Sequence, residues 1–131
     1  MNPEIKKMWV DALRNGEYQQ GYNYLAVHQG ESVHFCCLGV LCDLAKQRGV
    51  IDSNQDEYGR YSYGTYSNFT DVVLPKGVQE WAGLTVDNPE LEVELNNEYE
   101  EEFVTEVRLS ELNDDHGFDF EKLANLIEKQ L

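Results

Sequence analysis

The chain has 131 residues, 41% of them hydrophobic, and a formal net charge of −15 at neutral pH. This length predicts one domain, residues 1–131, and the composition is that of a globular protein rather than a disordered one. No apolar run is long enough to cross a bilayer and the first residues lack an apolar signal core, so we expect no membrane contact and a cytoplasmic location.

The negative charge is concentrated in the last third of the chain. Residues 1–84 carry 10 acidic and 7 basic side chains, whereas residues 85–131 carry 15 acidic and 3 basic ones. Because a phosphate backbone requires positive charge, the second region argues against direct binding of nucleic acid.

The first predicted element is a helix capped by Asn2, with Pro3 in its first turn and Gly16 closing its end. Its apolar residues recur with helical spacing and form one stripe that predicts a core-facing side: Ile5, Met8, Trp9, Ala12 and Leu13. A polar link at 17–21 follows, and then a predicted hairpin with strands at 22–27 and 33–37.

A buried helix is predicted from Leu38 to Gly49. Its inner face is formed by Leu38, Leu41, Cys42 and Ala45. Residues 52–70 are polar and rich in tyrosine and glycine, which predicts a loop with short strand pieces. A short helix opens at Leu74-Pro75 and ends at Gly83.

Alternating residues predict two strands, at 91–95 and 103–109, joined by an acidic turn at 96–102. A turn containing Asn113 and Asp114 precedes a last helix capped by Asp119. The order of elements predicts an α+β fold, a single compact domain of antiparallel hairpins packed against about four helices.

The three cysteines, Cys36, Cys37 and Cys42, lie between apolar residues and predict buried thiols in a reducing compartment. They lack a second ligand pair at zinc spacing, so we expect no metal and no other cofactor. A cysteine-dependent hydrolase is a weaker alternative, in which a thiol at the strand-to-helix junction is the nucleophile. Its base and orienting residues would come from His34 or His116 and from Asp114 or Asp115.

Several segments together resemble a widespread family of small proteins encoded by tailed phages and prophages. They are Trp9-Val-x-Ala-Leu-Arg-x-Gly-x-Tyr-x-Gln-Gly, Phe35-Cys-Cys-Leu-Gly-Val-Leu-Cys-Asp-Leu-Ala, Leu74-Pro, Glu80-Trp-Ala-Gly-Leu, Leu112-Asn-Asp and Phe120-x-x-x-Ala-x-Leu-Ile-Glu. The resemblance implies a counter-defence protein that acts in the cytoplasm of an infected bacterial host by binding rather than by catalysis. The Tyr-rich loop is longer, and the late hairpin more acidic, than the family pattern.

We expect the ligand to be a small nucleotide-like immune signal that the protein sequesters. We also expect a homo-oligomer, because proteins of this kind often share such a pocket between subunits. Tyrosine rings can stack on a base, an arginine can hold a phosphate, and carboxamide and carboxylate groups can read polar edges. The candidate pocket residues are Tyr18, Gln20, Arg60, Tyr63, Asn113 and Asp114.

The alternative function uses the acidic hairpin as a nucleic-acid mimic that inhibits a basic host defence protein, as anti-CRISPR or anti-restriction proteins do. Nine glutamates fall between residues 90 and 111, against a single arginine, Arg108. The residues expected to contact the partner are Glu98, Glu100, Glu101 and Glu102.

Overall fold

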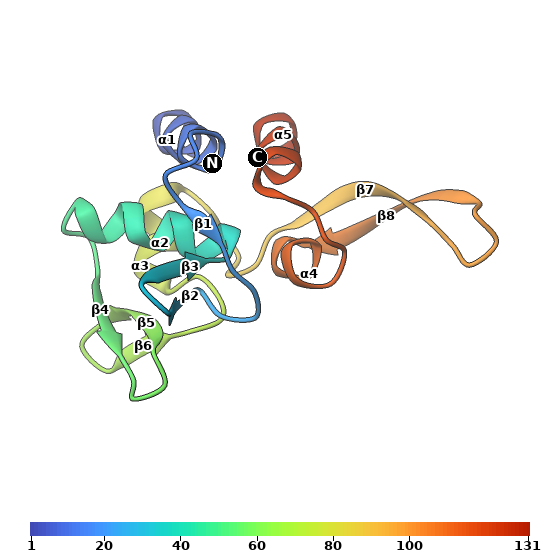
Figure 1. Cartoon of the computed structure of the whole chain (residues 1–131). Helices are drawn as coiled ribbons and strands as arrows, with labels where there is room; N and C mark the ends of the chain where they lie inside the picture. The colour runs from blue at the N-terminus through green and yellow to red at the C-terminus, as the bar shows by residue number, and fades with distance from the viewer.

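Helix α2 (Cys37–Gln47) lies at the centre of the computed structural model, which describes all 131 residues (Figure 1). Every residue from Cys37 to Cys42 is buried, so this helix contacts protein on nearly all sides. An amphipathic surface helix would leave one side to water. The predicted inner face of Leu38, Leu41, Cys42 and Ala45 is confirmed, since none of the four is exposed.

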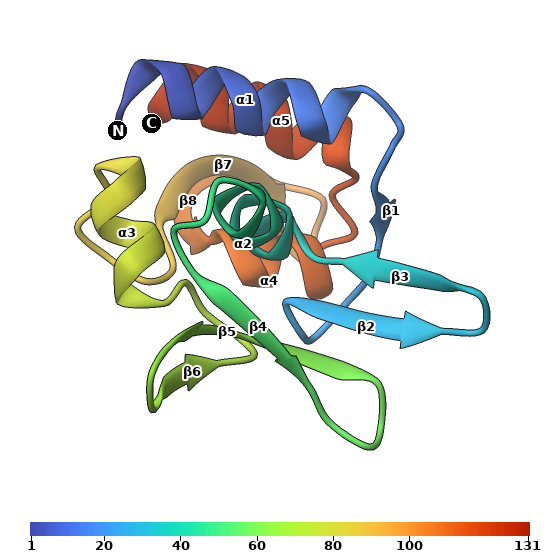
Figure 2. The same ribbon diagram turned by 90° about the vertical axis from the view of Figure 1, so that its left-hand side faces the viewer.

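The other elements surround α2 in layers (Figure 2). Helices α1 (Pro3–Arg14) and α5 (Phe120–Gln130) run antiparallel and cover one side. Helices α3 (Lys76–Ala82) and α4 (Leu109–Asp114) flank α2. The six strands of the larger sheet lie on the side away from α1 and α5 and are β1 (Gln19–Gln20), β2 (Ala26–Gln29), β3 (Ser32–Phe35), β4 (Asp52–Gln55), β5 (Arg60–Thr65) and β6 (Asn68–Thr70).

The order in this sheet is β1-β3-β2-β5-β4, with β6 paired to β5, and every pairing except β1–β3 is antiparallel. A separate two-stranded sheet, β7 (Glu90–Asn96) and β8 (Glu102–Arg108), extends away from the layers as an arm (Figure 1). The predicted α+β single domain is confirmed. None of the five helices combines the length and apolar character that crossing a membrane requires.

Three sequence-based predictions need correction. Residues 52–70 form three paired strands rather than a loop with strand pieces. The first strand of the predicted hairpin lies at Ala26–Gln29, not at 22–27, and its turn lies at 30–31. Asn113 and Asp114 lie in α4, a helix that the sequence did not predict, rather than in a turn. This helix of six residues is too short to show an apolar period.

The helix ends follow the predicted capping residues. Asn2 Oδ1 accepts the backbone N–H of Glu4 at 2.9 Å, and Asp119 Oδ1 accepts that of Lys122 at 2.9 Å. Gly83 ends α3 in the left-handed conformation, with φ 70°. Each satisfies backbone groups that the helix itself leaves unpaired.

Gly39 gives α2 its close approach to the strand layer. The Leu25 carbonyl oxygen, which accepts the Cys36 N–H at 3.1 Å, occupies the space that a Cβ at position 39 would need. A side chain at this position would therefore push α2 away from the sheet.

We expect Gly39→Ala to lower the free energy of unfolding by about 3 kcal/mol or more, because the clash is with buried backbone that cannot yield locally. The matched control is Gly77→Ala in α3, where a Cβ would meet only Ile51 Cγ2 at 3.2 Å. That control is expected to stay within about 1 kcal/mol of wild type. Urea denaturation of both variants measures the difference, and equal stabilities would contradict this account of Gly39.

Candidate functional site

The six residues predicted to form a ligand pocket lie in separate contact groups. Gln20, Asn113 and Asp114 are joined by hydrogen bonds. Tyr18 bonds to α2 instead, and Arg60 lies at the β4–β5 turn. Tyr63 is buried in β5, with 2% of its surface exposed. The structure therefore joins three of the six by hydrogen bonds, places Tyr18 and Tyr63 near one carboxylate, that of Asp43, and leaves Arg60 apart.

Asn113 is fully buried, and its side-chain amide is saturated by four hydrogen bonds. Its Oδ1 accepts from Gln20 Nε2 at 2.8 Å and from the Cys37 backbone N–H at 3.3 Å. Its Nδ2 donates to the Gly21 carbonyl at 2.9 Å and to Asp114 Oδ1 at 2.8 Å. An amide has two donors and two accepting lone pairs, so no polar atom of Asn113 is left for a ligand. Asn113 thus links α4, α2 and the β1 segment.

Tyr18 is tied to α2 through Asp43. Its hydroxyl donates to Asp43 Oδ2 at 2.5 Å, and Gln47 Nε2 donates to the same carboxylate at 2.8 Å. Burial and then the Asp43 carboxylate raise the pKa of Tyr18. Burial also raises the pKa of Tyr63, with Asp43 as the next contribution. Both phenols therefore stay neutral at physiological pH.

Arg60 is held by side chains of the β4–β5 turn and of the segment before β2. Its guanidinium lies 4.9 Å from the Tyr24 ring centre and 5.1 Å from that of Tyr58. Its Nε forms an ion pair with Asp56 Oδ2 at 3.1 Å, and its Nη1 donates to the Tyr24 hydroxyl at 2.9 Å. The aromatic and cationic groups predicted for base stacking are thus packed on one another at the surface.

The two cavities lie elsewhere. The larger, about 510 Å³, lies between α5 and β7, and the smaller, about 200 Å³, lies between β5–β6 and the start of α3. None of the six predicted residues lines either one. The residues around the larger cavity are Glu92, Val93, Glu94, Phe118, Lys122, Asn125, Leu126, Lys129 and Gln130.

The arm has two chemically different faces. Directly opposed residues of an antiparallel pair share a face, and successive residues alternate. Leu91 and Val93, opposite Val107 and Thr105, form the inner face. Beyond the Glu90–Arg108 pair at its base, the outer face carries four more exposed glutamates and one exposed valine, Val104: Glu92, Glu94, Glu102 and Glu106. The register was needed to find this face, and only Glu102 was among the residues predicted from sequence.

Like charges face each other on this outer surface. Glu92 lies directly opposite Glu106 at a pair that is not hydrogen-bonded, where side chains come closest. Such a pair destabilises a sheet. The only cation on the arm is Arg108 at its base, 3.9 Å from Glu90 and 3.4 Å from Glu111. Neither Glu92 nor Glu106 forms an ion pair within 4 Å.

The tip of the arm holds the other predicted glutamates, Glu98, Glu100 and Glu101. Asn97 Oδ1 accepts the backbone N–H groups of Tyr99 and Glu101, at 2.9 Å and 3.0 Å, and so shapes the turn. Glu100 has φ 60°, a left-handed conformation that glycine adopts more readily. Tyr99 is 75% exposed, so the tip presents an aromatic ring among carboxylates.

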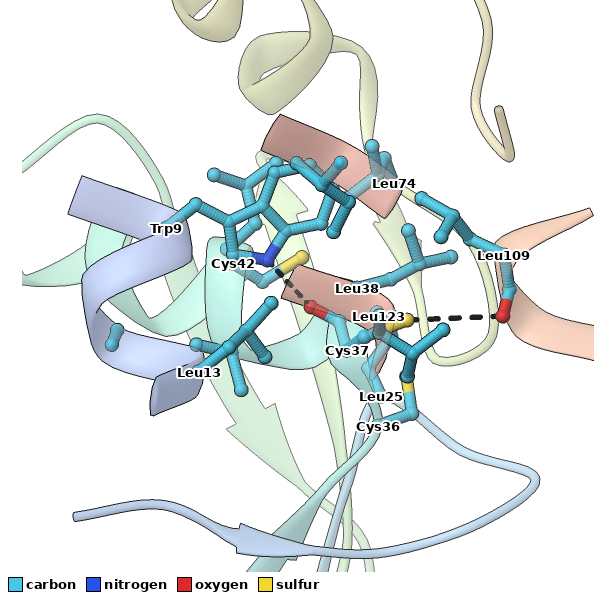
Figure 3. Close-up of a cluster of buried hydrophobic side chains, with 14 of the residues drawn as sticks. Trp9, Leu13, Leu25, Cys36, Cys37, Leu38, Cys42, Leu74, Leu109 and Leu123 are labelled. Atoms are coloured by element: carbon cyan, nitrogen blue, oxygen red, sulfur yellow. Dashed lines mark hydrogen bonds between the residues drawn. The ribbon is translucent and has the colours of Figure 1, made fainter. Parts of the chain in front are cut away.

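The three cysteines are buried and unpaired, as predicted (Figure 3). Burial raises the pKa of the Cys36 thiol to about 12, although the Gly39 N–H that it accepts at 3.4 Å acts in the opposite direction. Burial raises the pKa of Cys37 and Cys42 as well. No group of three or more His, Cys, Asp or Glu side chains is placed to hold a metal ion.

Over residues 1–131 the chain matches the family described as Domain of unknown function (DUF8296), and it belongs to that family. Neither the curated proteins nor the solved structures contain a match to it. Because the family match covers the whole chain, both the layered body and the arm lie within the family's domain.

We expect Asn113→Ala to lower the free energy of unfolding by about 3 kcal/mol, because the Cys37 N–H and the Gly21 carbonyl would lose their partner inside the core. The matched control is Asn125→Ala on α5, which removes one exposed hydrogen bond to Arg14 and should cost about 1 kcal/mol or less. Thermal and urea unfolding measure both. Equal losses would show that the Asn113 network has no special role.

The native thiols are expected to resist alkylation. With a pKa of about 12 for Cys36, only about one thiol in 10⁴ is ionised at pH 8. Iodoacetamide should therefore leave the folded protein unmodified and label all three cysteines in denaturant, as mass spectrometry would show. Rapid labelling of Cys36 or Cys37 in the folded protein would instead favour a nucleophilic thiol.

Proposed function

We propose that this DUF8296-family protein is a non-catalytic binding protein that uses the outer face of its β7–β8 arm to engage a basic surface of a partner protein. The observation that carries the proposal is the projecting acidic face, with Glu92 held directly opposite Glu106. A two-stranded sheet gains little stability from such a pair, so the arrangement favours a role outside folding.

Electrostatics supports a basic partner. The last third of the chain holds 15 acidic and 3 basic side chains, and the arm carries most of this excess away from the body. A cationic surface docking on the outer face would neutralise the Glu92–Glu106 repulsion and be steered by the field of the arm. Binding of this kind weakens as salt screens the charges.

The resemblance to phage proteins gives the proposal a biological direction. A basic surface that binds nucleic acid is common to nucleases of bacterial defence, and a row of carboxylates on two adjacent strands presents negative charge as a phosphate backbone does. We therefore propose that the protein acts in an infected bacterium by occupying the nucleic-acid-binding surface of a defence nuclease.

Sequestration of a small nucleotide-like signal has less support from the geometry. Asn113 has no free polar atom, Arg60 is held by Asp56 and two tyrosines, and none of the six predicted residues lines a cavity. A cysteine-dependent reaction also has less support, because burial keeps the thiols protonated.

The proposal is tested with an arm variant in which Glu92, Glu94, Glu102 and Glu106 are all replaced by glutamine. We expect wild-type protein to inhibit DNA cleavage by a purified defence nuclease, with inhibition that weakens as NaCl is raised. The arm variant should lose at least tenfold in affinity. It should nevertheless unfold at the same or a higher temperature, because the Glu92–Glu106 repulsion is gone.

The matched control replaces four exposed glutamates of the body by glutamine, which changes the net charge equally: Glu4, Glu17, Glu31 and Glu57. This control should inhibit within about twofold of wild type, since charges far from the contact are screened. Equal losses of affinity in the two variants would mean that inhibition depends on the net charge of the protein and not on the position of the glutamates. Undiminished inhibition by the arm variant would rule out the arm as the binding surface.

A further inference from the structure

One side chain is bound to the arm in the way that a neighbouring strand would be. The Gln130 amide at the end of α5 accepts the Glu92 backbone N–H at 2.8 Å and donates to the Glu92 carbonyl at 2.8 Å. A residue of a third strand would make the same two bonds with β7. Gln130 thus occupies one position of the open edge of β7 with a peptide-like group.

The edge continues beyond Gln130 without a partner. Backbone hydrogen bonds to β8 involve every second residue of β7. Glu94 and Asn96, two and four residues after Glu92, therefore direct their N–H and C=O groups away from β8, as Glu92 does. No backbone or side-chain group outside the arm bonds to the N–H or C=O of Glu94 or Asn96. The backbone of β7 next to Gln130 is therefore free to pair.

The larger cavity opens beside this edge. Its walls are β7 at residues 92–94, the face of α5 that carries Lys122 and Leu126, and Phe118 in the segment that precedes α5. Its volume of about 510 Å³ has room for side chains of an added strand. Val93, Phe118 and Leu126 give it an apolar part on the inner side of the sheet, while Glu92 and Glu94 belong to the outer side.

We propose that an extended segment of the partner protein adds to the edge of β7 at Glu94 as a third strand, with alternating basic and apolar side chains. Alternate side chains of an added strand point to opposite faces, so the basic ones would meet Glu92 and Glu94 and the apolar ones would enter the cavity. Lys122 and Lys129 in that cavity disfavour a cation on the inner side. The inference rests on the proposed role of the arm.

Charge complementarity identifies the occupant as another protein rather than a second copy of this chain. Pairing two β7 edges would bring Glu92 and Glu94 of one copy beside the same glutamates of the other, and like charges on adjacent strands are unfavourable. A basic segment removes this repulsion. An exposed strand edge in a protein is commonly protected by charge against self-association, which these glutamates provide.

The test uses a short synthetic peptide in which lysine and valine alternate, measured by fluorescence anisotropy with the full-length protein. Glu94→Pro removes the outward N–H of the edge without touching the β7–β8 ladder. Its matched control is Val104→Pro, which is directly opposite on β8 and turns its N–H to the far edge. Glu94→Gln separates the effect of charge from that of the backbone.

We expect Glu94→Pro to weaken peptide binding roughly tenfold, and Glu94→Gln and Val104→Pro each to weaken it several-fold less, because both keep the backbone N–H groups of the β7 edge. Two further peptides carry N-methyl groups on alternate backbone nitrogens. The peptide whose methyl groups face the β7 edge should lose binding, and the peptide whose methyl groups face away from it should retain binding. Circular dichroism and melting temperature establish that both proline variants are folded.

The outcomes separate this inference from the proposed function. Equal effects of the two proline variants, or equal binding of both methylated peptides, would overturn strand addition while leaving charge-driven binding by the arm intact. If the β7 edges of two copies paired with each other instead, light scattering would detect a dimer, and this result would also overturn the inference. If replacing Glu92, Glu94, Glu102 and Glu106 with glutamine left peptide binding unchanged, both strand addition and the proposed function of the arm would be contradicted.

Discussion

The N-terminal turn of α2 is buried, and the rest of the fold depends on how its polar backbone groups are satisfied there. These groups cannot reach water, so each must find a partner inside the protein. Asn113 of α4 accepts the Cys37 N–H, and the Cys36 thiol accepts the Gly39 N–H at 3.4 Å. The indole N–H of Trp9 in α1 donates to the Cys37 carbonyl at 2.9 Å, as Figure 3 shows. Segments from both ends of the chain must therefore assemble around this turn together.

The same constraint explains the residues around 35–45 that carry the family resemblance. Gly39 allows contact with the Leu25 carbonyl, Cys36 caps the helix with a small polarisable atom, and Cys42 fills the core without a hydroxyl to satisfy. Their chemistry is that of packing and capping. This block therefore has a role in how the body folds, and says little about what the protein binds.

The arm stands in physical contrast to the body. One core cluster of 28 residues fills the body and reaches the inner face of the arm at Leu91, Val93 and Val107. The arm's outer face instead gathers glutamates on a two-stranded sheet and leaves one strand edge open. A well-packed body can tolerate an unfavourable surface elsewhere, because stability is distributed unevenly over a structure. Placing repulsive charge and unpaired backbone together on a projecting element separates binding from folding, which is the basis of both proposals made above.

The sequence by itself determined the local elements: the capped helices at both ends, the inner face of α2, the two arm strands and the burial of the cysteines. Helical period, capping and strand alternation act over a few residues, so they can be read without the rest of the chain. Helix α4 was missed because its six residues are too few to show a helical period. The strands at 52–70 were missed because β4 is wholly polar and the alternation of Tyr61 and Tyr63 in β5 ends at Gly64. Only the tertiary structure decided that Asn113 is saturated inside the core, that Glu92 faces Glu106, and that Gln130 pairs with β7. Each of these contacts joins residues far apart in the chain, and such pairings depend on how the elements pack rather than on neighbouring sequence.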